Sequence, residues 1–308
     1  MGQSFFSRTH VNSITKVEEL ESLSIFLRQI SHIGHIIIFL DFNSNTMGLF
    51  DLFKKEPKPK SQGSNILLAM PMFINGDTYE IKKIIESLKK LWDLEITDFD
   101  GDDNVATFKV NGEMVAIANM PVQIPLGDIE GTAKYAYNWP KALDDLKDHT
   151  GHAIVSVMAG LKSPLDRFKI LSKVLCSILI TSNSVGVYQG SQSLLIPSEQ
   201  YLNNIEELKD DGTPVFLWIY IGLKQYKTGN SAYTYGLKDF QKQEIEIIDS
   251  SLSLEELLQF LGNIASYVIA NDITLKNGET VGYTADQKIS VTISKGQFIE
   301  GQSIKLEI

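Results

Sequence analysis

The sequence predicts an α+β protein with mixed, largely antiparallel sheets and packed helices. Strand-like segments of alternating or continuous apolar residues are interspersed with helix-like segments, in which apolar residues recur at three- and four-residue spacing. Several strand segments are joined by short turns rich in Asp, Asn and Gly, which favours hairpins over parallel crossovers. The 308 residues are 43% hydrophobic and 21% charged, as in an ordinary globular protein.

The first half of the predicted order covers residues 65–160. It opens with an apolar strand and an amphipathic helix, followed by three strands that turns connect. A second helix then precedes a strand without polar alternation, which is typical of a sheet covered on both faces. The predicted strands are residues 66–73, 94–99, 105–110, 113–119 and 152–158, and the predicted helices are residues 78–92 and 138–148.

The second half, residues 161–308, continues the same mixture. Its last helix has a capping box at its start, formed by Ser253 and Glu256. This order of strands and helices is compatible with two subdomains divided near residues 160–164, and equally with one compact unit. The predicted helices are residues 164–181, 198–209 and 253–271, and the predicted strands are residues 185–188, 215–224, 232–235, 244–249, 289–294 and 303–307.

The N-terminal residues differ from the rest. Residues 1–46 lack the layout of a signal peptide, and a second beginning appears at Met47. We therefore expect residues 1–46 to be a non-native extension from a misplaced start codon. Residues 47–64 are predicted to be a flexible leader and linker. Their short amphipathic stretch beside several lysines leaves peripheral membrane association through residues 47–60 as one hypothesis, although so few residues bury little area.

The charge balance restricts the choice of partners. A formal net charge of −10 argues against nucleic-acid binding, which needs a basic surface to displace counterions. The same charge is compatible with a basic protein partner. Cys176 is the only cysteine, so no internal disulfide can form and a cytoplasmic location is expected. Its apolar helical surroundings predict a buried structural thiol.

Two histidines are candidate metal ligands. His149 and His152 follow the predicted helix 138–148, and Asp145 and Asp148 lie close to them in sequence. Together these four residues could supply the three or four ligands that a metal site needs. The structural alternative places His149 at a helix C-terminus, where a partly positive ring is favoured, and His152 at the start of a strand. A metal-binding protein or hydrolase is therefore kept as an alternative.

A second set of residues points to a protein partner. Aromatic residues concentrate on the predicted strands 215–224 and 232–235, and two glutamates alternate on the strand after them. Aromatic side chains anchor protein interfaces because they bury large areas at low entropic cost, although they are equally common in cores. The candidate partner-binding residues are Trp218, Tyr220, Tyr233, Tyr235, Glu244 and Glu246. No glycine-rich nucleotide loop or nucleophile motif occurs, so no cofactor and no catalytic residue are assigned.

Several short motifs, taken together with their order and spacing along the chain, resemble those of a known protein family. They are residues 118–125, 139–140, 152–155, 184–188, 234–237, 244–247 and 277–282. On these motifs, residues 65–308 resemble bacterial domain-of-unknown-function family 4261. A looser likeness is to suppressor-of-fused-type domains, whose bacterial members are thought to include toxin-neutralising immunity proteins. That likeness implies an interaction module without catalysis. The leading hypothesis is therefore a non-catalytic protein-binding module, of which an immunity or antitoxin-like factor is one form.

Overall fold

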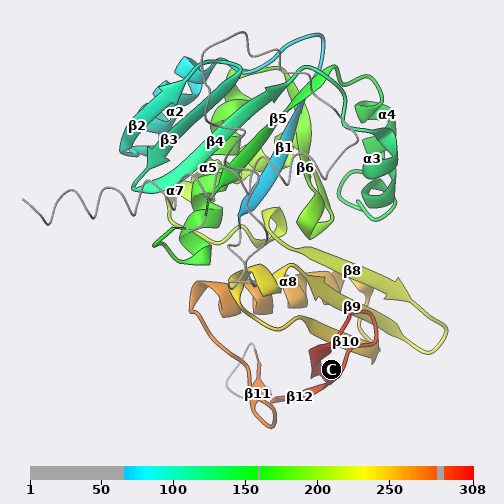
Figure 1. The fold of residues 1–308 in the computed structure, drawn as a ribbon. Coiled ribbons are helices and arrows are strands. Elements are labelled where there is room, and N and C mark those ends of the chain that lie inside the picture. The colour runs from blue at the N-terminus through cyan, green and yellow to red at the C-terminus, as the bar shows by residue number, and fades with distance from the viewer. Residues whose placement is uncertain (1–65, 159, 283–287) are drawn as a thin grey trace, which may run out of the picture. The chain divides into compact units, whose positions relative to one another are not determined.

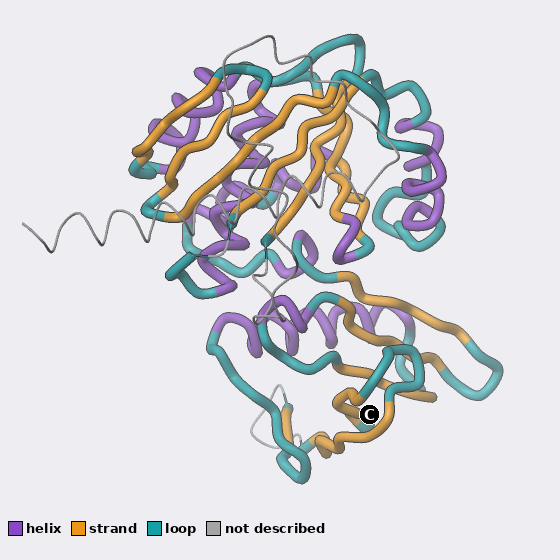
Figure 2. Tube along the Cα trace, in the orientation of Figure 1, coloured by secondary structure: helices purple, strands orange, loops and turns teal. Residues whose placement is uncertain are grey.

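Two mostly antiparallel sheets organise the chain (Figures 1 and 2). The computed structural model describes residues 66–158, 160–282 and 288–308, and residues Leu67–Ile308 form one compact unit. Within the described residues there are thirteen strands and seven α-helices. The predicted α+β class is therefore confirmed. The predictions for residues 1–46 and for residues 47–64 lie outside the described residues.

The first sheet has seven strands in the order β2-β3-β4-β5-β1-β6-β7. Every neighbouring pair in it is antiparallel. β1 lies between β5 and β6, so the first described strand is enclosed by strands that come much later in the sequence. The bounds are β1 (Leu67–Phe73), β2 (Ile96–Gly101), β3 (Val105–Val110), β4 (Glu113–Met120), β5 (Gly151–Val157), β6 (Ser184–Gln189) and β7 (Leu194–Pro197).

Two long helices cover one face of this sheet. α2 (Ile81–Trp92) packs against α5 (Pro164–Thr181), and α5 lies on β1 and β5. The hydroxyl of Ser163 accepts a hydrogen bond from the backbone amide of Asp166, which caps the start of α5. Cys176 on this helix is fully buried, and burial raises the pKa of its thiol to about 12. The predicted buried structural thiol is confirmed.

Four shorter helices lie between the strands of this sheet or directly after its last strand. They are α3 (Leu126–Ala133), α4 (Ala142–Leu146), α6 (Ser198–Asn203) and α7 (Ile205–Lys209). α3 was not predicted, and α4 is shorter than the predicted helix. A single helix was predicted where α6 and α7 lie. It is interrupted at Asn204, where the backbone leaves the helical conformation and the side-chain amide donates to the Gln200 carbonyl oxygen.

The second sheet has six strands in the order β11-β12-β13-β10-β9-β8. Its pairs are antiparallel except β10 with β13, which is parallel. Helix α8 (Leu254–Ala270) packs on β8 and β9, and the predicted capping box at its start is present. The bounds are β8 (Tyr220–Gln225), β9 (Asn230–Tyr235), β10 (Ile245–Ser250), β11 (Thr280–Val281), β12 (Ile289–Lys295) and β13 (Gln302–Leu306).

The predicted strand 215–224 begins later than its apolar pattern indicates. Residues Val215–Leu217 form a 3₁₀ turn directly after Pro214, and the strand starts at Tyr220. The whole segment is apolar because both the turn and the strand are buried, and apolar content alone does not distinguish the two. Trp218 therefore lies before the strand and does not share a strand face with Tyr220.

The boundary between the sheets falls between β7 and β8. A division near residue 160 would pass through the seven-stranded sheet, because α5, β6 and β7 all follow that point and belong with β1. The alternation of strands and helices looks the same on both sides of this point, so the sequence pattern does not show where one sheet ends and the other begins. Among the described helices, none is both long and apolar enough to cross a membrane.

Candidate functional site

Aromatic side chains gather on one face of the β8–β9 hairpin. In the antiparallel register, Tyr220 lies opposite Tyr235, and Gly222 lies opposite Tyr233. The residues between them, such as Ile221, point to the other face and join the core beneath α8. Because side chains alternate along a strand, the tyrosines occupy the face turned away from α8. All three tyrosines are half-buried.

Further rings extend this cluster beyond the hairpin. The ring centroids of Tyr137 and Tyr220 are 6.2 Å apart, those of Tyr220 and Tyr233 are 6.3 Å apart, and those of Tyr233 and Phe298 are 5.3 Å apart. These separations are in the range of favourable aromatic pairs. Tyr135 and Tyr226 are also close enough to influence the cluster electrostatically. We call this set the aromatic surface: Tyr135, Tyr137, Tyr220, Tyr226, Tyr233, Tyr235 and Phe298.

Much of the aromatic surface is open to solvent. The exposed fractions of Tyr135, Tyr226 and Tyr137 are 51%, 48% and 43%. Single exposed aromatic side chains are ordinary on a protein surface, whereas a group of them is typical of an interaction site.

A glycine gives Tyr233 its position. A Cβ atom at Gly222 would collide with the ring of Tyr233, so the ring lies directly over the glycine on the neighbouring strand. In this place the ring reaches Phe298 on one side and Tyr220 on the other. The cross-strand pair of glycine and tyrosine thus sets the centre of the aromatic surface.

Two lysines lie over rings at the margins of the aromatic surface. Lys224 Nζ is 5.7 Å from the ring centroid of Tyr135, and Lys238 Nζ is 5.0 Å from that of Tyr235. Both distances suit cation–π attraction. These contacts place positive charge beside the rings even though the chain as a whole is acidic.

The tyrosine hydroxyls are held in their protonated form. Burial raises the pKa of Tyr137 to about 12, and burial together with neighbouring tyrosines raises the pKa values of Tyr220 and Tyr233. At neutral pH these side chains therefore offer neutral O–H donors beside apolar rings. This combination suits binding to a surface with both polar and apolar groups.

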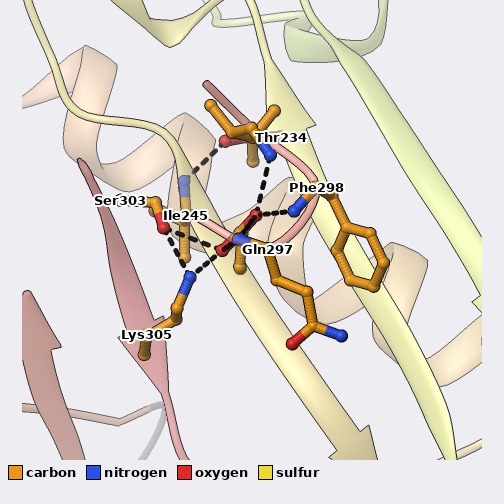
Figure 3. Close-up of polar contacts among 8 residues, drawn as sticks. Thr234, Ile245, Gln297, Phe298, Ser303 and Lys305 are labelled. Carbon is orange, nitrogen blue, oxygen red and sulfur yellow. Dashed lines mark hydrogen bonds and ion pairs between the residues drawn. The ribbon is translucent and has the colours of Figure 1, made fainter. Parts of the chain in front are cut away.

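The carboxylate of Glu246 holds the loop that carries Phe298. Figure 3 shows Gln297, Phe298, Ser303 and Lys305 converging on one carboxylate. The backbone amides of Gln297, Phe298 and Ile299 donate to Glu246 at 3.1, 2.6 and 3.0 Å. The Ser303 hydroxyl donates at 2.8 Å, and Lys305 forms an ion pair with the same side chain. Glu246 is fully buried, so this network fixes the loop from beneath.

Glu244 plays the same part for the turn after β9. Its carboxylate accepts hydrogen bonds from the Thr234 hydroxyl at 2.7 Å and from the Gly236 amide at 2.8 Å, with a longer one from the Lys238 amide at 3.3 Å. The Ile245 amide in turn donates to Thr234 Oγ1 at 2.8 Å. This network positions the backbone that presents Lys238 to Tyr235.

Three of the predicted partner-binding residues lie in the interior of the described structure. Glu244 and Glu246 are buried, and their oxygens are occupied by the chain itself, so neither can meet a partner directly. Trp218 is also buried, where its indole donates to Ser172 Oγ at 2.8 Å. Tyr220, Tyr233 and Tyr235 do lie together, and for them partner binding stays a prediction.

The predicted metal ligands are engaged elsewhere. His149 Nε2 accepts from the Ile124 amide at 2.8 Å, and its Nδ1 donates to the Leu146 carbonyl at 2.6 Å. His152 Nδ1 donates to the Val122 carbonyl at 2.8 Å. Burial lowers the pKa of His152 to about 4, so it is neutral at neutral pH. Both histidines thus serve as internal hydrogen-bonding groups.

The acidic members of the predicted metal site do not complete it. Asp145 accepts a hydrogen bond from the Trp139 indole at 2.7 Å, and Asp148 is exposed. In the part of the chain that the structure describes, no three His, Cys, Asp or Glu side chains are grouped as metal ligands. The predicted site of His149, His152, Asp145 and Asp148 is therefore not formed.

Four members of the aromatic surface were not among the predicted partner-binding residues: Tyr135, Tyr137, Tyr226 and Phe298. Tyr135 and Tyr137 lie between α3 and α4, where residues 135–139 hold three aromatic side chains in a turn-rich segment. Phe298 lies in a loop flanked by Gly296 and Gly301. A large aromatic residue in a glycine-flanked or turn-rich segment belongs to a loop, and loops lie mostly on the protein surface. Such residues could therefore have been identified from the sequence as candidates for surface exposure.

One comparison with known proteins found a match. The model of the family described as "Domain of unknown function (DUF4261)" matches residues 233–307. The resemblance to this family is therefore confirmed for these residues, which include Tyr233, Glu246 and Phe298. The motifs that precede residue 233 lie outside the matched range. No curated protein and no solved structure matches the chain.

Proposed function

We propose that this protein acts by binding another protein through the aromatic surface. The observation that carries the proposal is a group of seven exposed or half-buried aromatic side chains, four of which form successive ring pairs from Tyr137 through Tyr220 and Tyr233 to Phe298. Tyrosine is among the residues most enriched at energetically dominant positions of protein interfaces. A partner with an apolar patch and hydrogen-bond acceptors would complement the rings and their hydroxyls.

The buried carboxylates support this proposal. Glu246 fixes the loop of Phe298, and Glu244 fixes the turn of Lys238. A binding surface that is already ordered before the partner arrives loses less conformational entropy on binding. Both residues lie within the part of the chain that matches the family model.

The more specific predictions about the role, the partner and the location remain part of this proposal. An immunity- or antitoxin-like role would be one form of partner binding, and the looser likeness to suppressor-of-fused-type domains is its support. The acidic net charge supports a basic partner, and the single cysteine supports a cytoplasmic location. The membrane hypothesis concerns residues 47–60, which lie outside the described residues. The metal-dependent alternative loses its support because the predicted ligands bond to the protein itself.

Site-specific cross-linking in the native host tests the proposal. A photoreactive phenylalanine analogue at Tyr226 should cross-link to one specific protein when cells are irradiated. The matched control carries the same group at Tyr267, which lies on α8 outside the aromatic surface and is 53% exposed. Cross-linking at Tyr226 but not at Tyr267 supports the proposal. Equal products at both positions, or none at Tyr226, would count against it.

A further inference from the structure

A groove of about 450 Å³ opens beside the aromatic surface. Tyr137 and Tyr220 line it, so the groove and the aromatic surface are continuous. α6, α7, α8 and the segment before β8 supply most of its remaining walls. Its volume falls within the range of about 300–1,000 Å³ that is common for pockets that bind small ligands or side chains.

One wall of the groove is apolar. Phe216, Ile219 and Leu258 contribute to it, and Phe216 packs over Gly262 of α8. A Cβ atom at Gly262 would come within 2.5 Å of the Phe216 ring, so glycine is what allows the ring to lie against the helix. Phe216 remains 40% exposed, which leaves its ring accessible from the groove.

Another part of the lining carries the carboxamide side chains of Asn138, Gln200 and Asn204. Asn138 Nδ2 donates to the Leu195 carbonyl at 3.0 Å and to Gln200 Oε1 at 2.9 Å, and Asn204 Nδ2 donates to the Gln200 carbonyl at 2.7 Å. These bonds fix the orientation of the amides. Among the described residues, nothing donates to Asn138 Oδ1 or Asn204 Oδ1, and Gln200 Nε2 has no acceptor. This part of the lining thus presents acceptors and a donor of the kind that pair with a peptide backbone.

The charge of the groove is negative. Glu207 on α7 is exposed and is the one acidic or basic side chain among the described lining residues. The lysines beside the aromatic surface, Lys224 and Lys238, do not line the groove. A ligand with a positive side chain is therefore complementary to the groove itself.

We infer that the groove binds an extended segment of the partner protein that carries a lysine or arginine side chain. The carboxamides hydrogen-bond to the backbone of the segment, Phe216 contacts its apolar groups, and Glu207 pairs with its basic side chain. This inference rests on the proposed protein-binding function, because the same partner would lie across the aromatic surface and extend this segment into the groove.

An array of synthetic ten-residue peptides tests the inference. The full chain is applied to peptides with Lys, Gln or Glu at one central position in a varied background, and the best binder is then measured in solution. We expect lysine peptides to be selected, and their affinity to fall about fivefold when that lysine becomes Gln. In the variant Glu207→Lys the preference should reverse toward Glu.

Two further variants show whether the peptide binds in the groove. Glu206→Lys makes the same charge change on the same helix but outside the groove, and it should leave the preference unchanged. Asn263→Trp places a large ring in the groove from an exposed position of α8, and it should abolish peptide binding while circular dichroism shows an intact fold. No selected peptide, or selection that neither Glu207→Lys nor Asn263→Trp alters, overturns the inference. Such a result leaves the cross-linking test of the aromatic surface standing.

Discussion

At the scale of single residues, buried carboxylates do most to order the candidate site. Glu246 accepts hydrogen bonds from three consecutive backbone amides and pairs with Lys305. A buried charge is costly unless several groups compensate it, and here the loop supplies that compensation. The position of Phe298, and with it one edge of the aromatic surface, therefore depends on this one side chain.

Replacing this carboxylate should destabilise the protein. Glu246→Gln removes the charge, leaves Lys305 without its anion and directs amide hydrogens toward backbone donors. We expect the free energy of unfolding to fall by about 2–4 kcal/mol, measured by urea denaturation. Glu255→Gln, at an exposed position in the first turn of α8, is the matched control and should change it little. A loss below about 1 kcal/mol for Glu246→Gln would show that the loop is held by other contacts.

His152 should make stability depend on pH. Its pKa is about 4 in the folded state, because burial disfavours the charged ring, and 6.5 is the ordinary value. The unfolded state therefore takes up the proton first as the pH falls. Stability should be greatest above pH 6.5 and decline between 6.5 and 4, by up to about 3 kcal/mol. Chemical denaturation across this range measures the decline, and His152→Gln should flatten it. If the free energy of unfolding changes equally with pH in the wild type and the variant, groups other than His152 cause the decline.

At the scale of elements, the β8–β9 hairpin shapes the aromatic surface. Its register sets Gly222 opposite Tyr233 and Tyr220 opposite Tyr235, so a single pairing fixes all three rings. Side chains along the hairpin also alternate between two faces: the tyrosines lie on the aromatic surface, and the residues between them pack beneath α8. A shift of one residue would exchange the two faces, which makes the register essential to the site.

A methyl group at Gly222 should disturb the site more than the fold. In Gly222→Ala the new Cβ displaces the ring of Tyr233 from Phe298, while the strand pairing is kept. We expect partner affinity to fall about tenfold and the free energy of unfolding to fall by only about 1 kcal/mol. Gly127→Ala is the control, because its Cβ would meet no neighbouring atom. Unchanged affinity in Gly222→Ala, measured by titration with the cross-linked partner, would remove Tyr233 from the binding surface.

Local sequence patterns predicted most of the helices and strands, but they did not predict how these elements pack against one another. The capping box of α8 and the hairpin strands of the first sheet were predicted because adjacent residues determine them. The burial of Glu246 was not predictable, because its partners lie some fifty residues later in the chain and its own strand reads as half-polar. Tyr233 and Tyr235 were found by alternation, whereas Tyr137 and Phe298 join them only through tertiary contacts.

At the scale of the whole molecule, a stack of three rings links segments that are distant in sequence. Phe168 of α5 stacks on Phe240 with centroids 4.4 Å apart, and Trp218 lies 5.8 Å from Phe168 and 5.9 Å from Phe240. This buried stack belongs to the core, which explains why Trp218 cannot contact a partner. The three rings of this stack are therefore buried, whereas the aromatic surface is partly exposed.

The role proposed for the aromatic surface is to bind a protein partner. Isothermal titration of the partner identified by cross-linking tests it most directly, with the variant Tyr137→Ser/Tyr233→Ser compared with Tyr267→Ser. Two tyrosines at the centre of an interface should together account for a loss of affinity of about thirtyfold or more. The control on α8 should bind as the wild type does. Wild-type affinity in the double variant, with its fold intact, would contradict the account.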